Sequence, residues 1–179
     1  MNKTGNSEQE INEIQSLIST LGNPDEQKRS GARLSLIDIG KKATPYLIQS
    51  LSQGDCMIRW ETAKILSVTR DRSAVPALVT ALQDEDHDVR WAAMDALINI
   101  DQEAMEPLLK ALIKDFDSVF LRNAAHHILH VLRNKGHLDA HLFQVLQALE
   151  EMEPEVTVPW AAQDAWETLY GKKKAIQES

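Results

Sequence analysis

The chain has 179 residues, of which 43% are hydrophobic and 26% are charged, and this composition is typical of a globular protein with a single core. It carries 27 acidic against 19 basic residues, a formal net charge of −8, which argues against nucleic acid or anionic lipid as a partner because such binding depends on clustered lysines and arginines. Cys56 is the only cysteine, which excludes an intramolecular disulfide and a metal site built from several thiolates.

The chain begins with polar residues, MNKTGNSEQE, where a secretory signal would need an apolar segment. No apolar run approaches the roughly 18 residues of a membrane helix. We therefore expect a cytoplasmic protein that has no membrane partner.

Five copies of one pattern follow one another along the chain. We place them at residues 9–41, 42–71, 72–102, 103–136 and 137–170 in one domain (9–170), with flexible tails at 1–8 and 171–179. An offset of 31 residues lays Pro45 on Pro76, Arg59 on Arg90 and Trp60 on Trp91. The fourth copy has one residue inserted before its arginine. In the fifth, VPWAAQDAW follows VRWAAMDAL of the third. An internal repeat of this length indicates stacked helical units.

Each copy is predicted to be a pair of helices. The first helix has leucines four residues apart, such as Leu78 and Leu82, and a proline in its first turn, where a missing N–H costs nothing. An acidic break such as QDEDHD then supplies caps for the second helix, whose Val89, Ala93 and neighbouring apolar residues share one side. One pair cannot bury both of its faces, so the pairs must stack. The sequence predicts an all-α solenoid of about five helical pairs.

The succession of proline, two leucines, aspartate, Val-Arg and Ala-Ala followed by Ala-Leu resembles the HEAT repeat, in the short form of the phycobilisome-lyase proteins. The resemblance implies an α-α superhelix whose second helices line the concave side. It also implies a ladder between repeats, in which aspartates pair with arginines of the second helices. Its members are Asp25, Asp55, Asp86 and Asp117 with Arg29, Arg59, Arg90 and Arg122. Pro159 replaces the arginine in the fifth copy, so the ladder is expected to end there, at a terminal cap.

The predicted binding face is the side of the second helices that points away from the core and into the concave groove. On a helical wheel, residues such as Trp91 lie opposite the core side, and tryptophan is a common anchor at interfaces. Packing of Trp60 against Trp91 is the alternative explanation. The predicted groove comprises Trp60, Lys64, Trp91, Met94, Asp95, Ile98, Asn123, His126, His127, His130, Trp160 and Asp164. We expect it to bind a protein or peptide, with no catalytic residues and no cofactor.

Parts of this face also suggest zinc binding, DNA repair and the binding of a small ligand. His126 and His130 have a spacing that can chelate zinc, but two nitrogens do not make a site, so no metal is predicted. Trp91 and Asp95 are one turn apart, as in the HEAT-like alkyl-base DNA glycosylases, but the groove lacks the cations that duplex DNA needs. The second hypothesis is a chromophore (bilin) lyase-like subunit or small-ligand chaperone, in which the tryptophans and histidines hold a flat conjugated ligand.

Overall fold

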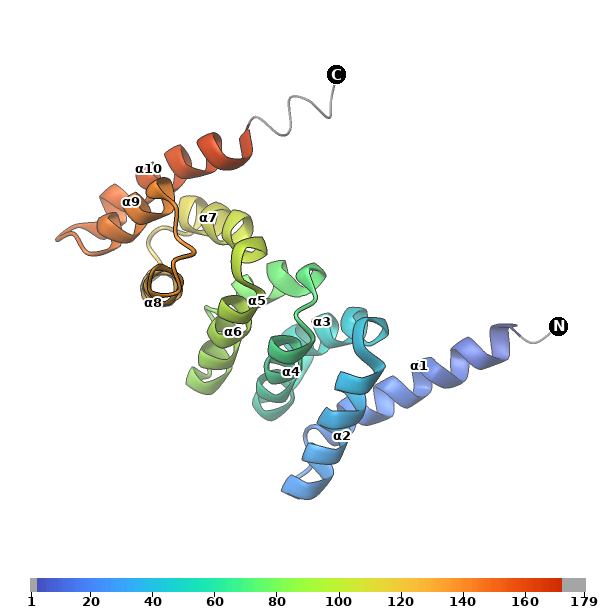
Figure 1. Ribbon diagram of the computed structural model, residues 1–179. Coiled ribbons are helices and arrows are strands. Elements are labelled where there is room, and N and C mark those ends of the chain that lie inside the picture. The colour runs from blue at the N-terminus through green and yellow to red at the C-terminus, as the bar shows by residue number, and fades with distance from the viewer. Residues whose placement is uncertain (1–2, 172–179) are drawn as a thin grey trace. The chain divides into compact units, whose positions relative to one another are not determined.

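The computed structural model describes residues 3–171, and this part of the chain is built of α-helices joined by short turns (Figure 1). The all-α class expected from the sequence is confirmed, and the helices pack in sequential pairs as in a HEAT-repeat solenoid. The chain divides into two compact units at Asn99 and Ile100, and each is described by itself. No helix within 3–171 is long and apolar enough to cross a membrane.

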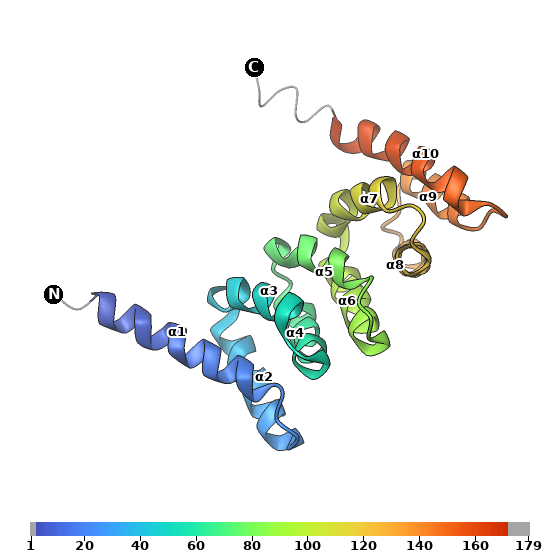
Figure 2. The ribbon, with the colours of Figure 1, turned by 180° about the vertical axis from the view of Figure 1, so that it is seen from behind.

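The first unit contains three helical pairs. The first helix of each pair, called the A helix, is α1 (Lys3–Thr20), α3 (Thr44–Gln53) or α5 (Val75–Ala81). The second, called the B helix, is α2 (Glu26–Ile39), α4 (Cys56–Thr69) or α6 (His87–Ile100). The 3-10 turns η1 (Gly40–Lys42) and η2 (Arg72–Ala74) connect one pair to the next. Helix α3 packs between α1 and α5, and α2 packs against α4, so the A and B helices form two rows (Figure 2).

The repeated leucines form the core of this unit. Leu47 and Leu51 of α3, and Leu78 and Leu82 of the next copy, are buried at equivalent positions. The prolines lie in the first turns of α3 and α5 as predicted. Gly40 ends α2 at a φ of 65°, a backbone conformation that favours glycine, and donates its N–H to the carbonyl of Leu36. The repeated leucines and prolines therefore occupy the core positions and the helix starts that the sequence predicted.

Helix α1 begins earlier than the sequence suggested. It starts at Lys3, inside the stretch 1–8 that was expected to be a flexible tail. Extending an existing helix adds one backbone hydrogen bond per residue, and the stretch contains no proline to prevent it. The expected C-terminal tail lies outside the described residues, apart from Gly171.

Three of the four ladder aspartates, Asp25, Asp55 and Asp86, cap helices. Asp25 accepts the backbone N–H of Gln27, and Asp55 accepts that of Ile58. Asp86 likewise accepts the N–H groups of Asp88 and Val89, while Ser118 is the N-cap after Asp117. These carboxylates therefore satisfy the free N–H groups at the start of α2, α4 and α6.

The ladder arginines share a different set of partners. Each lies in the first turn of its helix and donates to carbonyls of the preceding loop, five or six residues back. The bonds join Arg29 to Asn23 and Pro24, Arg59 to Gly54, Arg90 to Asp84 and Glu85, and Arg122 to Phe116. Side chains on a helix tilt toward its N-terminus, which aims these guanidinium groups at the loop. An ion pair between the second and third copies joins Arg59 to Asp84, with Nε–Oδ2 and Nη2–Oδ1 distances of 2.8 Å.

The second unit contains four α-helices among its described residues. After the turn η3 (Asp101–Ala104) come α7 (Met105–Lys114), α8 (Val119–Asn134), α9 (Ala140–Leu149) and α10 (Pro154–Trp166), followed by the π-helical turn η4 (Glu167–Gly171). Helix α8 packs against α7 and α9, and α10 packs against α9 and α7. The four helices therefore close a ring.

This ring changes the place of the fifth copy. If α9 and α10 continued the two rows, the A helix α9 would lie beside α7 and the B helix α10 beside α8. Instead α9 packs against α8, and α10 packs against α7. The earlier pairs are joined by 3-10 turns, whereas a loop through Gly136, with a φ of 75°, leads from α8 to α9. This loop lets α9 return along α8. Trp160 and Asp164 thus lie on a helix that packs against the A helix α7, whereas two continuous rows would have placed it beside the B helix α8.

Candidate functional site

The candidate site is the outer side of the B helices in the first unit. We define the B-helix face as Leu34, Trp60, Lys64, Val68, Trp91 and Asp95, the side chains on α2, α4 and α6 that retain solvent exposure there. Three of them are large apolar residues with most of their surface exposed: 63% for Leu34, 59% for Val68 and 55% for Trp91. Each of the three helices thus contributes one such residue.

The exposed strip is narrower than the wheel predicted. Met94 and Ile98, expected in the groove, are buried, as is Ala63 at the position equivalent to Met94. A helical wheel with a single buried side treats the flanks of the helix as exposed to solvent. Helix α4, however, packs against α2 on one flank and is hydrogen-bonded to α6 on the other. Residues at the edges of the predicted face are therefore covered, and only its middle remains exposed.

A buried carboxylate lies beneath the face on α4. Glu61 has no exposed surface, and its Oε2 atom is 2.5 Å from Arg33 Nη1 and 3.4 Å from Lys64 Nζ. Its Oε1 atom is 3.7 Å from Arg29 Nε. Three cations therefore compensate one buried charge, and two of them come from α2. A buried charge is tolerated only with such partners, so the cluster fixes α4 against α2.

Lys64 also orients Trp60. The Nζ atom of Lys64 is 3.8 Å from the centroid of the Trp60 ring, within the range of a cation–π contact. The indole is partly buried and lines a pocket of about 310 Å³ between the first turns of the B helices. That pocket is also lined by Arg29, Cys56, Met57, Asp86 and Asp88. Trp60 is thus positioned by a residue of its own helix, and its indole forms one wall of the small pocket.

Asp95 connects two helices of the face. Its Oδ2 atom accepts a hydrogen bond from Ser67 Oγ of α4 at 2.8 Å and another from Asn99 Nδ2 at 3.2 Å. Asn99 also donates to Ser67 Oγ at 2.8 Å. This polar triangle holds α4 beside α6, as the Glu61 cluster holds α2 beside α4. The Oδ2 atom of Asp95 is engaged in these contacts between helices, while its side chain remains exposed.

The predicted histidines belong to the second unit. The rings of His126 and His130 are 6.1 Å apart, His126 Nε2 is 3.4 Å from a Glu150 oxygen, and His130 Nδ1 is 3.3 Å from Asn134 Nδ2. Within residues 3–171, no group of three or more His, Cys, Asp or Glu side chains is placed to hold a metal ion. The remaining predicted residues of this unit are His127, partly buried, and Asn123, Trp160 and Asp164, all exposed.

Glu61 and Met57 were missed by sequence reasoning. Glu61 falls at the position of Ala92 in the next copy, on the side of the helix that faces the core. A charged residue on an otherwise apolar stripe was the signal that could have identified it, because a buried charge requires partners. Two of its three partners lie on α2, 28 and 32 residues away, and no local pattern identifies those two.

Residues 44–130 match the model of HEAT repeats. The match covers α3 to α7 and most of α8, and so includes the second and third copies of the repeat and much of the fourth. HEAT repeats are typical of protein-binding scaffolds. No curated protein matches the chain.

Proposed function

We propose that the chain is a non-enzymatic scaffold that binds a partner protein or peptide on the B-helix face. The observation that carries this proposal is the exposure of Leu34, Val68 and Trp91 on three consecutive B helices of the first unit. Exposed apolar side chains that gather on one surface mark interaction sites, and tryptophan is enriched among the residues that dominate binding energy. HEAT repeats over residues 44–130 agree with a role of this kind.

The polar contacts beneath the face support the proposal. The Glu61 cluster sets the spacing of α2 and α4, and the Asp95 triangle sets that of α4 and α6. A partner would therefore meet side chains whose helices are already fixed, so less conformational entropy is lost on binding. We further assign the repeats to the short HEAT form on their period of about 31 residues. The acidic sequence and the exposed thiol of Cys56 fit a reducing, cytoplasmic environment.

A chromophore-lyase role is the alternative, in which tryptophans and histidines hold a flat conjugated ligand. Trp60 and Trp91 belong to the first unit, whereas His126 and His130 belong to the second together with Trp160. Co-expression with a bilin source and a visible spectrum tests this alternative, since a coloured protein would favour it over the scaffold.

Photo-crosslinking tests the scaffold proposal. A photoreactive residue is introduced in place of Leu34 or of Val68 and, as a matched control, in place of Val156, which is 54% exposed on α10. After irradiation in cells, the two B-helix positions should capture the same partner, and the Val156 position should not. Equal capture from all three positions, or none from the B-helix positions, would contradict the proposal.

A further inference from the structure

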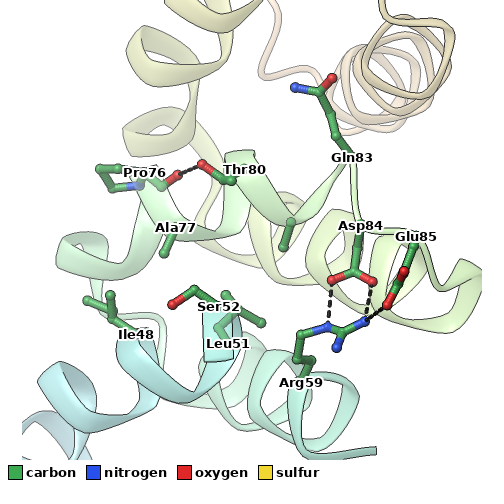
Figure 3. A pocket seen from close by; sticks show the side chains of 11 residues that line it. Ile48, Leu51, Ser52, Arg59, Pro76, Ala77, Thr80, Gln83, Asp84 and Glu85 are labelled. Atoms are coloured by element: carbon green, nitrogen blue, oxygen red, sulfur yellow. Dashed lines mark hydrogen bonds and ion pairs between the residues drawn. The ribbon is translucent and has the colours of Figure 1, made fainter. Parts of the chain in front are cut away.

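A pocket of about 720 Å³ lies between the A helices α3 and α5 of the first unit (Figure 3). None of the six residues of the B-helix face lines it. Its volume falls within the range of about 300 to 1,000 Å³ that is usual for ligand sites. It combines an apolar wall with charged groups gathered at one end, as Figure 3 shows.

The pocket lies beside the end of a short helix. Helix α3 has ten residues, whereas α5 has seven. After Ala81 the α-helical hydrogen bonds give way to bonds between residues three apart. The N–H of Gln83 bonds to the Thr80 carbonyl at 3.1 Å, and that of Asp84 bonds to the Ala81 carbonyl at 3.2 Å. Under the 31-residue offset, α5 therefore stops about one turn before the position where α3 ends. The early end brings residues 83–85 to the pocket as a loop.

The wall of the pocket is apolar and made partly of small side chains. Ile48 and Leu51 come from α3, while Pro76, Ala77 and Ala81 come from α5. Ala77 and Ala81 are four residues apart and lie on the same face of α5. Because a methyl group fills little space, these two positions leave the volume open where longer side chains would close it.

The charged end of the pocket contains one exposed carboxylate, that of Glu85. Arg59 is held by both oxygens of Asp84 and by Glu85 Oε1 at 3.3 Å, and it also donates to the Gly54 carbonyl. These acceptors occupy all three of its nitrogens, so the guanidinium is poorly available to an incoming anion. Arg90 lies against the same loop and donates to the carbonyls of Asp84 and Glu85. The Glu85 carboxylate projects into solvent and accepts one long bond from Arg59, so it favours a cationic ligand.

We propose that this pocket binds a lysine or arginine side chain of a partner peptide together with an adjacent apolar residue. The methylene groups of the basic side chain lie along the wall between α3 and α5, and its charged group pairs with Glu85. The adjacent apolar residue lies against Ala77 and Ala81. The net charge of −8 attracts a basic peptide to the chain over longer distances.

Titration of the full ¹⁵N-labelled chain with three blocked dipeptides tests the proposal. The probes are acetyl-Leu-Lys-amide, acetyl-Leu-norleucine-amide, which has a chain of similar length and no charge, and acetyl-Leu-Glu-amide. Each is added to about 10 mM, because ligands of this size bind in the millimolar range. The lysine probe should shift the amide signals of Ala77, Thr80 and Glu85, and the other two should shift them much less.

Three variants sharpen the test. Glu85→Gln should weaken binding of the lysine probe about three-fold, the size expected for an exposed ion pair. Glu13→Gln, which removes an exposed charge from α1, should leave binding unchanged, and Ala77→Leu should abolish it by filling the wall. Unchanged spectral dispersion shows that each variant is folded. The proposal is overturned if the lysine probe shifts none of these amides, if the uncharged or acidic probe shifts them equally, or if Glu85→Gln binds as tightly as wild type.

Discussion

Replacing Arg33 with methionine should destabilise the first unit by leaving Glu61 without its nearest cation. The two atoms Arg33 Nη1 and Glu61 Oε2 are 2.5 Å apart, and Glu61 has no exposed surface. Removal of one partner from a buried ion pair costs about 3 to 5 kcal/mol. Lys64 at 3.4 Å and Arg29 at 3.7 Å remain near the carboxylate, so we expect the lower end, about 3 kcal/mol.

The double variant Arg33→Met/Glu61→Leu separates this mechanism from simple loss of packing. Replacing both partners of a buried pair with apolar residues is often neutral, so the double variant should recover most of the stability lost by Arg33→Met. Urea unfolding followed by circular dichroism gives the free energies, and Arg72→Met, an exposed arginine on η2, is the control. A loss below about 1 kcal/mol for Arg33→Met, or equal losses for the single and double variants, would refute the reasoning.

Three further predictions concern pH, the loop and cooperativity. Burial alone would raise the pKa of Asp84, but hydrogen bonds from Arg59 and from the Asp86 N–H hold that pKa below its usual value. The stabilisation is therefore complete above about pH 4, the pKa of an unfolded aspartate, and is lost as the pH falls through the lower folded pKa. Between pH 5 and 2.5 the urea midpoint should fall less steeply in Asp84→Asn than in wild type, and parallel curves would contradict this assignment. Arg90→Met should cost about 1 to 2 kcal/mol in urea unfolding, because it removes the Nη1 donor that bonds to two loop carbonyls, and an unchanged midpoint would contradict that role. Calorimetry should give one transition, since repeats depend on nearest-neighbour contacts, whereas two separated transitions would count against one continuous array.

The sequence predicted what local rules decide. The 31-residue period gave the helical pairs, because leucines four residues apart define a helix with one buried side. Proline in the first turn marked the starts of α3 and α5. Capping was predicted as well, but the same aspartates were also assigned to a ladder implied by the resemblance, and a carboxylate at an N-cap is already occupied by backbone N–H groups.

The remaining features depend on residues distant in sequence. Met94 is buried because a helix in a row has neighbours on its flanks, which a wheel of one helix does not contain. The partner of Arg59 is Asp84, 25 residues away, and it is in reach because α5 ends early. The packing of α10 against α7 follows from the loop between α8 and α9, although the sequence of α10 repeats that of α6 closely.

The affinity of a crosslinked partner for Trp91→Ala tests the central claim most directly. Once the partner is identified, its dissociation constant is measured by titration calorimetry for wild type, for Trp91→Ala and for Trp160→Ala, which removes an exposed tryptophan of the second unit. If Trp91 anchors the partner on the B-helix face, its removal should cost at least about 2 kcal/mol of affinity, while the Tm and the Trp160→Ala affinity stay close to wild type. A lowered Tm with unchanged affinity for Trp91→Ala would show that the indole serves packing, and would contradict the proposed function.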